Sequence, residues 1–283
     1  MGYSTVFLPD HLDSQWAPLI GLTVAAEATE RLRVGSLVLC NDYRHPLVVA
    51  KELATLDLVS EGRLEAGLGA GWLRTDYEAA GIGYDAASIR ISRLAETASI
   101  LKGLWSDPKG GFDFAGEHYR ISLPACEPAP YSPGGPPLTI GGGGERILSL
   151  AAKVADVVGI NPSLASGAVD ASAVASALPS HFDRRIHWVR EAAGERIDLI
   201  ELQCLTFMVE IGRGAKPRLE ALAGHFGLEP DVASEIPVVV FGEVEEVCEM
   251  LIRRRERWGF NYWVVHDHEA EAFSAVVERL AGR

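Results

Sequence analysis

A chain of 283 residues that is 48% hydrophobic and 23% charged can bury a large core, which fits one large α/β domain as well as two small ones. Its formal net charge of -13 at pH 7 argues against nucleic acid or an anionic membrane as the main partner, because phosphate groups favour basic surfaces. We therefore expect a small molecule as the substrate.

The cysteines and the chain start indicate where the protein works. Cys40, Cys126, Cys204 and Cys248 are far apart in the sequence and form no CxxC pair, so we interpret them as reduced thiols. No apolar run of about 18 residues is present, and the first residues lack the basic start and apolar stretch of a signal peptide. The sequence predicts a cytoplasmic protein without a membrane anchor.

The first elements predict a strand, a helix and a second strand. Ser4 to Leu8 is typical of a short strand, which ends at once in the loop residues Pro9-Asp10-His11. A helix is expected from Leu19 to Arg31. The apolar run from Val34 to Cys40 is typical of a parallel strand that is covered on both faces.

A βαβ unit follows from the second strand onward. Pro46 opens a helix that continues to Val59, with apolar residues near one face of a repeat of about 3.6 residues. The next strand is Leu64 to Leu68. A crossover of this length joins parallel strands and is right-handed almost without exception.

The rest of the chain repeats this alternation. Helices are predicted at Ser88–Trp105, Glu145–Val154, His181–Ala193, Arg218–Phe226, Val244–Trp258 and Phe273–Leu280. Strands are predicted at Leu138–Ile140, Asp156–Ile160, Ile197–Ile211 and Asn261–Val265, with only a short extended piece at Val238–Phe241. Residues 106–137, rich in proline and glycine, predict an inserted excursion with a hairpin at Phe112–Ile121. Ser163 to Ser180 predicts a mobile loop.

Repeated βα units favour a single (β/α)8 TIM-barrel domain over residues 1–283, with the excursion at about 106–137. Seven barrel-like strands can be counted, so the first strand is apparently absent from the sequence. An open doubly wound sheet is the alternative architecture.

In a barrel the active site lies where the strands end at their carboxyl sides, which selects the candidate residues. They are Asp10, His11, Cys40, Asn41, Asp42, Gly69, Gly71, Trp72, Gly141 to Gly144, Asn161, His266, Asp267 and His268.

Two glycine-rich turns have a chemical and a purely structural interpretation. Gly141 to Gly144 stand between a strand and a helix, where bare amides favour a phosphate, although a flexible tight turn is the alternative. The run fits neither the P-loop nor the Rossmann spacing. Gly67 to Trp72 keeps side chains off the backbone, as a flat ring packed there would require, or simply forms a tight turn with a core tryptophan.

Histidines suggest two further possibilities. His11 beside Asp10 at a strand end could bind a ring or carry a proton, although such a pair is often structural. His266 and His268 have the spacing of metal ligands, but no third and fourth ligand is evident, so a surface loop is the preferred interpretation.

Four stretches carry a family resemblance: PDH at Pro9 to His11, RLRVGSLVLCNDYRHPLVVAKELATLDLVSEGRLEAGLGAGW at Arg31 to Trp72, RLAETASILKGLW ending at Trp105, and IGGGGERILSLAAKVADVVGINP at Ile140 to Pro162. With these the chain resembles the luciferase-like monooxygenase family, and most of all its oxidoreductases that depend on coenzyme F420, a deazaflavin. The resemblance implies a (β/α)8 barrel, usually dimeric, with the cofactor ring at the C-terminal mouth. Enzymes that use flavin mononucleotide (FMN) share these stretches.

The resemblance also implies roles for single residues. Asp10 and His11 would lie beside the ring, and His11 would donate a proton or contact substrate. Leu37, Val38 and Cys40 would pass under the ring, where relatives often carry a bulge with a non-proline cis peptide bond. The remaining implied cofactor contacts are Trp72 at the ring pocket, Thr75 at the ribityl chain or phosphate, and Gly142, Gly143 and Gly144 at the phosphate.

Two departures limit what the resemblance implies. The first barrel strand of the family is missing, and Trp72 stands where the sugar-phosphate dehydrogenases of the family carry a catalytic glutamate, so that activity is not expected. We predict an F420-dependent oxidoreductase that transfers a hydride to or from a small organic substrate. The alternatives are an FMN-dependent monooxygenase and a degenerate, non-catalytic cofactor-binding barrel, with a metal-dependent hydrolase a distant fourth.

Overall fold

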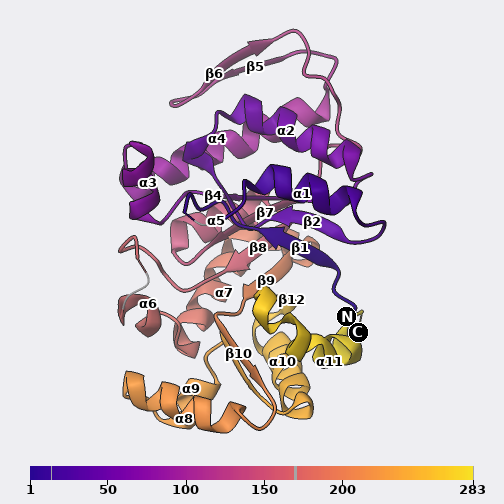
Figure 1. Ribbon diagram of the computed structural model, residues 1–283. Helices are drawn as coiled ribbons and strands as arrows, with labels where there is room; N and C mark the ends of the chain where they lie inside the picture. The colour runs from indigo at the N-terminus through magenta and orange to yellow at the C-terminus, as the bar shows by residue number, and fades with distance from the viewer. Residues whose placement is uncertain (14, 169–170, 283) are drawn as a thin grey trace. The chain divides into compact units, whose positions relative to one another are not determined.

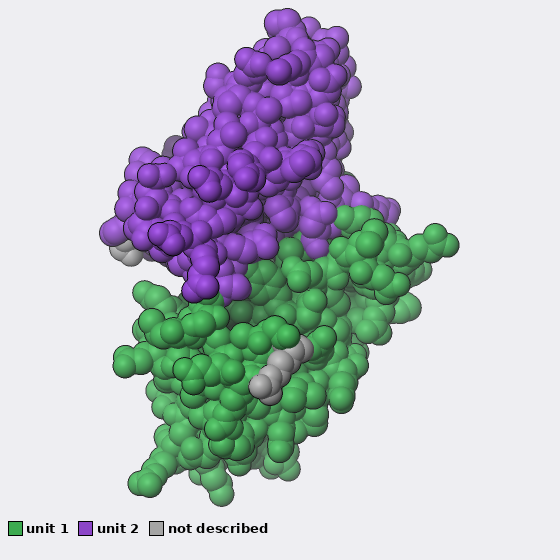
Figure 2. All heavy atoms as spheres, turned by 90° about the vertical axis from the view of Figure 1, so that its right-hand side faces the viewer, with its two compact units in different colours: residues 1–3, 142–152, 157–283 green, residues 4–141, 153–156 purple. Residues whose placement is uncertain are grey.

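The computed structural model describes residues 1–13, 15–168 and 171–282, and it divides into two compact units. Unit 1 comprises residues 1–3, 142–152 and 157–283, and unit 2 comprises residues 4–141 and 153–156, as coloured in Figure 2. None of the helices in the described ranges is long and apolar enough to cross a lipid bilayer.

Unit 2 is built on parallel strands whose order follows the sequence (Figure 1). The strands are β1 (Thr5–Leu8), β2 (Arg33–Ser36), β4 (Leu64–Gly69) and β7 (Leu138–Gly142), with the two-residue β3 (Leu39–Cys40) also paired to β4. The helical segments are α1 (Pro18–Glu27), η1 (Asn41–Tyr43), α2 (Pro46–Val59), α3 (Arg74–Ala80) and α4 (Ala87–Ser106). Helix α1 packs on β2, and α2 packs between α1 and α4.

The predicted strand from Val34 to Cys40 is not continuous. It stops after Ser36 and resumes at Leu39, and the peptide bond between Leu37 and Val38 is cis. A cis peptide bond with a non-proline residue is the feature that the family resemblance places at these positions. The predicted helix from Leu19 to Arg31 also ends early, at Glu27, because Arg33 already pairs with β1.

The glycines of β4 explain how the broken strand fits. A Cβ atom on Gly67 would lie 1.8 Å from the backbone oxygen of Ser36, and one on Gly69 would lie 2.5 Å from Cγ2 of Val38. The segment between β2 and β3 therefore lies directly against the backbone of β4. These glycines lie in the strand itself and serve the packing of the chain. The predicted contact of this stretch with a cofactor ring stays a prediction.

The excursion contains the predicted hairpin, formed by antiparallel β5 (Phe112–Ala115) and β6 (Arg120–Leu123). The carboxylate of Glu96 on α4 accepts hydrogen bonds from the amides of Glu117, His118 and Tyr119 in the hairpin turn, at 2.6 to 3.2 Å. A single carboxylate on α4 thus holds the hairpin turn.

Unit 1 contains a parallel sheet of β8 (Val157–Ile160), β9 (Glu201–Leu205) and β12 (Phe260–Val264), and a separate parallel pair of β10 (Met208–Ile211) and β11 (Val239–Gly242). Its helical segments are α5 (Glu145–Val154), α6 (Ala171–Ala175), α7 (Pro179–Ala193), η2 (Gly194–Leu199), α8 (Ala215–Phe226), α9 (Pro230–Ser234), α10 (Val244–Trp258), η3 (Asp267–Glu269) and α11 (Ala270–Leu280). The rings of Phe182, Trp258 and Phe260 pack together with centroids 6.0 to 6.3 Å apart.

Two predictions fail in unit 1. The long strand expected from Ile197 to Ile211 is a 3-10 turn followed by two strands that break at Thr206 and pair with different partners, since Thr206 bonds to Val264 of β12 and Phe207 to Val238. The loop expected from Ser163 to Ser180 contains α6, and α7 already begins at Pro179. Residues 169–170 of that loop lie outside the described residues.

The close approach at Gly67 predicts a strong stability effect. Gly67→Ala should lower the free energy of unfolding by about 2 to 4 kcal/mol, because the new methyl group would have to displace backbone. Gly83→Ala, where a Cβ meets nothing within 4 Å, is the matched control and should change it by less than about 0.5 kcal/mol. Equal urea midpoints for the two variants would contradict this packing.

Candidate functional site

Asp10, at the end of β1, connects three segments of unit 2. Its carboxylate accepts two hydrogen bonds from Arg44, at 2.6 and 2.9 Å, and a third from the amide of Cys40 at 2.9 Å. The side chain is nearly fully buried. Both oxygens are therefore occupied within the chain, so Asp10 shapes the site by fixing its neighbours. Its predicted contact with a cofactor stays a prediction.

His11 forms a dyad with a carboxylate that the sequence interpretation did not single out. Its Nδ1 lies 2.7 Å from Oδ2 of Asp76 on α3, and the Asp76 side chain is only 7% exposed. A carboxylate in this position accepts the Nδ1 proton and leaves Nε2 as the reactive nitrogen. The edge of Trp72 meets the imidazole with ring centroids 5.6 Å apart. The dyad matches the arrangement of an oriented proton carrier.

A network of buried hydroxyl and thiol groups supports the base of this cluster. The hydroxyl of Tyr77 donates to Asp42 at 3.0 Å and lies 3.4 Å from Sγ of Cys40. Burial is the main cause that raises the pKa of Cys40 and of Tyr77, so both stay protonated near neutral pH. Gly71 has φ +74°, and a Cβ there would lie 1.9 Å from the Tyr77 hydroxyl. Cys40 is thus a packed structural thiol, not a thiolate nucleophile.

Two other predicted cofactor contacts lie beside the dyad in the sequence. Trp72 is half-buried, and its carbonyl oxygen accepts a hydrogen bond from the hydroxyl of Tyr84 at 2.9 Å. Thr75 is exposed on α3, next to Asp76. The amide of Leu37, at the cis peptide, donates to Leu8 at the end of β1, and His11 after β1 contacts Asp76 in the first turn of α3.

The glycine turn belongs to unit 1, where Gly142 to Gly144 lead into α5. A Cβ on Gly143 would lie 2.4 Å from the carbonyl oxygen of Pro162, whereas one on Gly144 would meet nothing within 4 Å. The amide of Asn161 donates to Gly142, and Arg185 donates to the carbonyl of Gly143 at 2.9 Å. One side of the turn is tightly packed, and Gly144 is open beside the helix N-terminus.

These features fit a phosphorylated cofactor. The first-turn amides of a helix have no intrahelical partner, and the helix dipole favours negative charge there. In α5 the carboxylate of Glu145 already lies in this turn. The side-chain oxygen of Asn161 is buried without a hydrogen-bond partner among the described residues, which suits a hydroxyl donor such as that of a ribityl chain.

The two histidines near the C-terminus, His266 and His268, stack on each other. Their ring centroids lie 5.7 Å apart, and Glu269 accepts from the amides of His266 and Val209. In the described ranges no group of three His, Cys, Asp or Glu residues is arranged to hold a metal ion.

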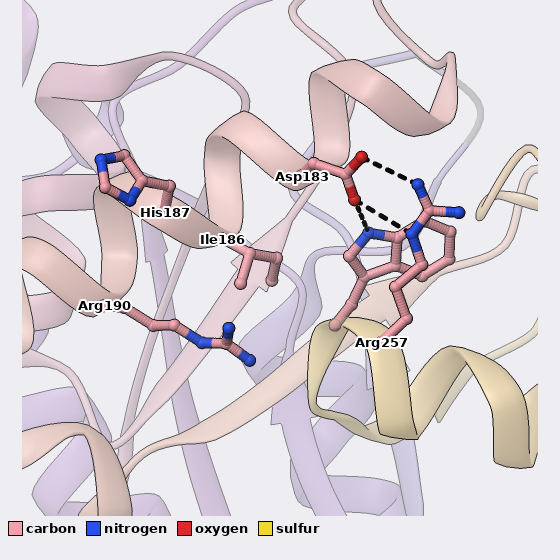
Figure 3. A pocket seen from close by; sticks show the side chains of 6 residues that line it. Asp183, Ile186, His187, Arg190 and Arg257 are labelled. Carbon is pink, nitrogen blue, oxygen red and sulfur yellow. Dashed lines mark hydrogen bonds and ion pairs between the residues drawn. The ribbon is translucent and has the colours of Figure 1, made fainter.

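A surface pocket of about 200 Å³ lies between α7 and α10 of unit 1 (Figure 3). It is lined by Asp183, Ile186, His187, Arg190, Arg257 and Trp258. Asp183 already accepts hydrogen bonds from Arg257 and from Nε1 of Trp258. None of the predicted site residues lines this pocket. Its histidine, His187, is exposed, and its Nε2 lies 3.7 Å from Oε2 of Glu191, beyond hydrogen-bond distance.

A family model and individual relatives show similarity to this chain. The family model described as luciferase-like monooxygenase matches residues 1–178. An FMNH2-dependent dimethylsulfone monooxygenase of Pseudomonas fluorescens is 32% identical over 129 residues, 46% of this chain and 34% of that protein. An F420-dependent glucose-6-phosphate dehydrogenase of Nakamurella multipartita is 31% identical over 163 residues, 55% of this chain and 47% of that protein. The matches span about a third to a half of the length of these relatives.

Solved structures agree over the whole chain. The coenzyme F420-dependent tetrahydromethanopterin reductase of Methanopyrus kandleri has a TM-score of 0.75 at 18% identity, covering 98% of this chain and 90% of that one. At this identity the likeness shows the fold alone. The predicted fold class, an α/β fold of the TIM-barrel type, is confirmed.

The ion pair between Asp10 and Arg44 should stabilise the fold more than an exposed ion pair does. Asp10→Asn should lower the free energy of unfolding by about 2 to 4 kcal/mol, because it leaves Arg44 largely buried with a neutral partner. Glu245→Gln, which removes the exposed pair with Arg279, should change it little. Chemical denaturation of both variants measures the difference. Comparable losses would show that the Asp10–Arg44 pair stabilises the fold no more than an exposed ion pair does.

Proposed function

Since the chain belongs to the luciferase-like monooxygenase family, we propose that it is an oxidoreductase that transfers a hydride between coenzyme F420 and a small organic substrate. The observation that carries this proposal is the His11–Asp76 dyad, which lies next to Trp72 in the unit that contains the Leu37–Val38 cis peptide. F420-dependent proteins among the relatives and the solved structures support the choice of cofactor.

The residues proposed to hold the cofactor fall into two groups. Gly142 to Gly144 and the N-terminus of α5 would bind its phosphate through backbone amides. Asp10, Leu37, Val38, Cys40, Trp72 and Thr75 are the proposed contacts of the ring and the ribityl chain. When bound, the deazaflavin supplies the hydride or accepts it.

His11 would provide the proton that accompanies the hydride. Asp76 accepts the Nδ1 proton at 2.7 Å, which fixes the ring orientation and assigns proton transfer to Nε2. If the substrate is a carbonyl compound, Nε2 would protonate its oxygen as reduction proceeds. In the reverse direction Nε2 would take the proton from a hydroxyl group. The edge of Trp72 and the 25% exposure of the His11 side chain limit the access of water.

Substitutions in the dyad should lower turnover more than cofactor affinity. His11→Ala should reduce kcat by about 100-fold to 10,000-fold, because the general acid or base is lost. Asp76→Asn should reduce it by about tenfold or more, since an amide no longer holds the same imidazole tautomer. His268→Ala, at an exposed site, serves as the control. Steady-state kinetics with F420, together with its dissociation constant, separate the two effects. Wild-type turnover in His11→Ala would remove His11 from the mechanism.

An FMN-dependent monooxygenase is the second candidate, favoured by the dimethylsulfone and trigonelline monooxygenases among the relatives. It predicts oxygen consumption when reduced flavin and substrate are supplied together. A degenerate cofactor-binding barrel would bind F420 or FMN and turn over neither. Oxygen uptake and F420 oxidation measured on the same preparation distinguish the three possibilities.

We further propose that the enzyme acts as a cytoplasmic homodimer. Its four cysteines are free thiols, as suits a reducing compartment. An apolar stripe runs along the exposed side of α1 and the residue before it: Trp16, Ile20 and Val24 are 73%, 70% and 59% exposed. Ile20 and Val24 are one turn apart on α1, and the Trp16 ring lies against Gly21 of the same helix. Exposed apolar side chains grouped in this way suit contact with a second copy.

A charge in this stripe should prevent association. Ile20→Lys should shift the mass measured by size-exclusion chromatography with light scattering from dimer to monomer, because an ammonium group would be buried in the interface. Ile252→Lys on α10, where the native side chain is 46% exposed, is the matched control and should leave the mass unchanged. A monomeric wild-type protein, or a dimeric Ile20→Lys variant, would contradict the proposal.

A further inference from the structure

Arg185 is a buried cation whose hydrogen-bond partners are backbone carbonyls. The residue is 3% exposed, its Nε donates to Gly143 at 2.9 Å, and its Nη1 donates to Ser176 at 2.7 Å. Among the residues that the structure describes, no carboxylate forms an ion pair with it. Arg254, which is equally buried, also bonds only to backbone carbonyls, but it donates four hydrogen bonds, to Ser234, Pro237, Ile236 and Val239. Arg185 donates two, so its positive charge is the less compensated of the two.

An uncompensated buried charge is costly. Its removal from water is repaid only by a counter-charge or by several well-aligned hydrogen bonds. Burial, with a smaller contribution from the neighbouring Arg184, lowers the pKa of Arg185 to about 10. The guanidinium is thus still charged at neutral pH, in a place that disfavours the charge.

The position of this charge is specific. The carbonyl that receives Nε belongs to Gly143, the central residue of the glycine turn, and the amides that follow open into α5 beside Gly144. The carbonyl that receives Nη1 belongs to Ser176, whose Oγ accepts a hydrogen bond from the amide of Ser163 at 2.8 Å. One guanidinium thus connects the glycine turn to both ends of the segment that follows Pro162.

We propose that Arg185 is the charge-compensating positioning residue of a phosphate site at Gly142–Gly144. A phosphate group bound by the amides of this turn neutralises the buried guanidinium, and Arg185 in return holds the turn in its binding shape through the Gly143 carbonyl. The inference rests on the proposed function in one respect, because it takes this turn as the place of the cofactor phosphate. It adds that phosphate alone, without a ring, stabilises the fold through Arg185.

The test is thermal unfolding of the apoprotein in inorganic phosphate and in chloride at equal ionic strength and pH. The midpoint of the wild type should rise in phosphate, because an anion that binds only the folded state stabilises it. Arg185→Met should lose this increment. Arg190→Met, an exposed arginine on the same helix, is the matched control and should keep it. A purely structural role would lower the midpoint of Arg185→Met equally in both salts and leave the increment intact, which would overturn the proposal.

Arg185→Lys keeps the inference testable if Arg185→Met does not fold. Lysine retains the charge without the planar fork, so the increment should persist but need about tenfold more phosphate. A response equal to that of the wild type would overturn the role of the fork, and no response in the wild type would overturn the site itself.

Paired ligands separate failure of this inference from failure of the proposed function. The wild type should bind FMN more tightly than riboflavin, and F420 more tightly than its phosphate-free deazaflavin riboside. Arg185→Met should reduce each of these preferences by about tenfold. If the wild type prefers the phosphorylated ligands and Arg185→Met does so equally, the role of Arg185 is wrong while the cofactor assignment stands. If neither cofactor binds the wild type, the proposed function fails first.

Discussion

The bidentate ion pair between Asp10 and Arg44 fixes the geometry of the candidate site in unit 2. The same carboxylate accepts the amide of Cys40, so one buried group joins the end of β1, the start of the turn after β3 and the segment that leads into α2. His11 follows Asp10 directly and therefore takes its position from this clamp. Because the charge is buried, its loss is expensive, whereas the exposed pairs elsewhere on the surface contribute little.

A buried charge is costly unless it has a partner, and this cost acts differently at the two candidate sites. Around His11 in unit 2 each buried carboxylate has a partner: Asp10 pairs with Arg44, and Asp76 pairs with the imidazole of His11. In unit 1 no carboxylate of the described residues pairs with the buried Arg185, which donates to the Gly143 carbonyl of the glycine turn. Because the charged groups of the His11 site pair with one another, they can hold the imidazole in one orientation. A site with a residual positive charge is suited to take an anion from solution.

Much of the fold could be predicted because the spacing of apolar residues within one segment indicates whether it forms a helix or a strand. Helix α2 begins at Pro46 and ends at Val59 as expected, and the strand that leads into the glycine turn is where the sequence places it. The break between β2 and β3 leaves no sign in the apolar run from Val34 to Cys40, since apolar composition does not report a cis peptide bond. The family resemblance supplied that feature where periodicity did not.

The chemistry of the site was harder to predict, because the partners of each group come from distant segments. Asp76 lies 65 positions from His11, and no local pattern connects them. One feature of the sequence points to Asp76: it closely follows the glycine-rich stretch that ends in Gly71 and Trp72, which is itself predicted to lie at the active site. Arg185 carried no signal either, since an arginine on a helix is ordinarily expected to face solvent.

Fluorescence titration of the purified protein with F420 and, separately, with FMN is the most direct test of the cofactor assignment. We expect micromolar or tighter binding of F420 and clearly weaker binding of FMN. Preferential binding of FMN would contradict the deazaflavin assignment and move the chain to the oxygen-using enzymes of its family. Binding of neither cofactor would contradict the proposed function.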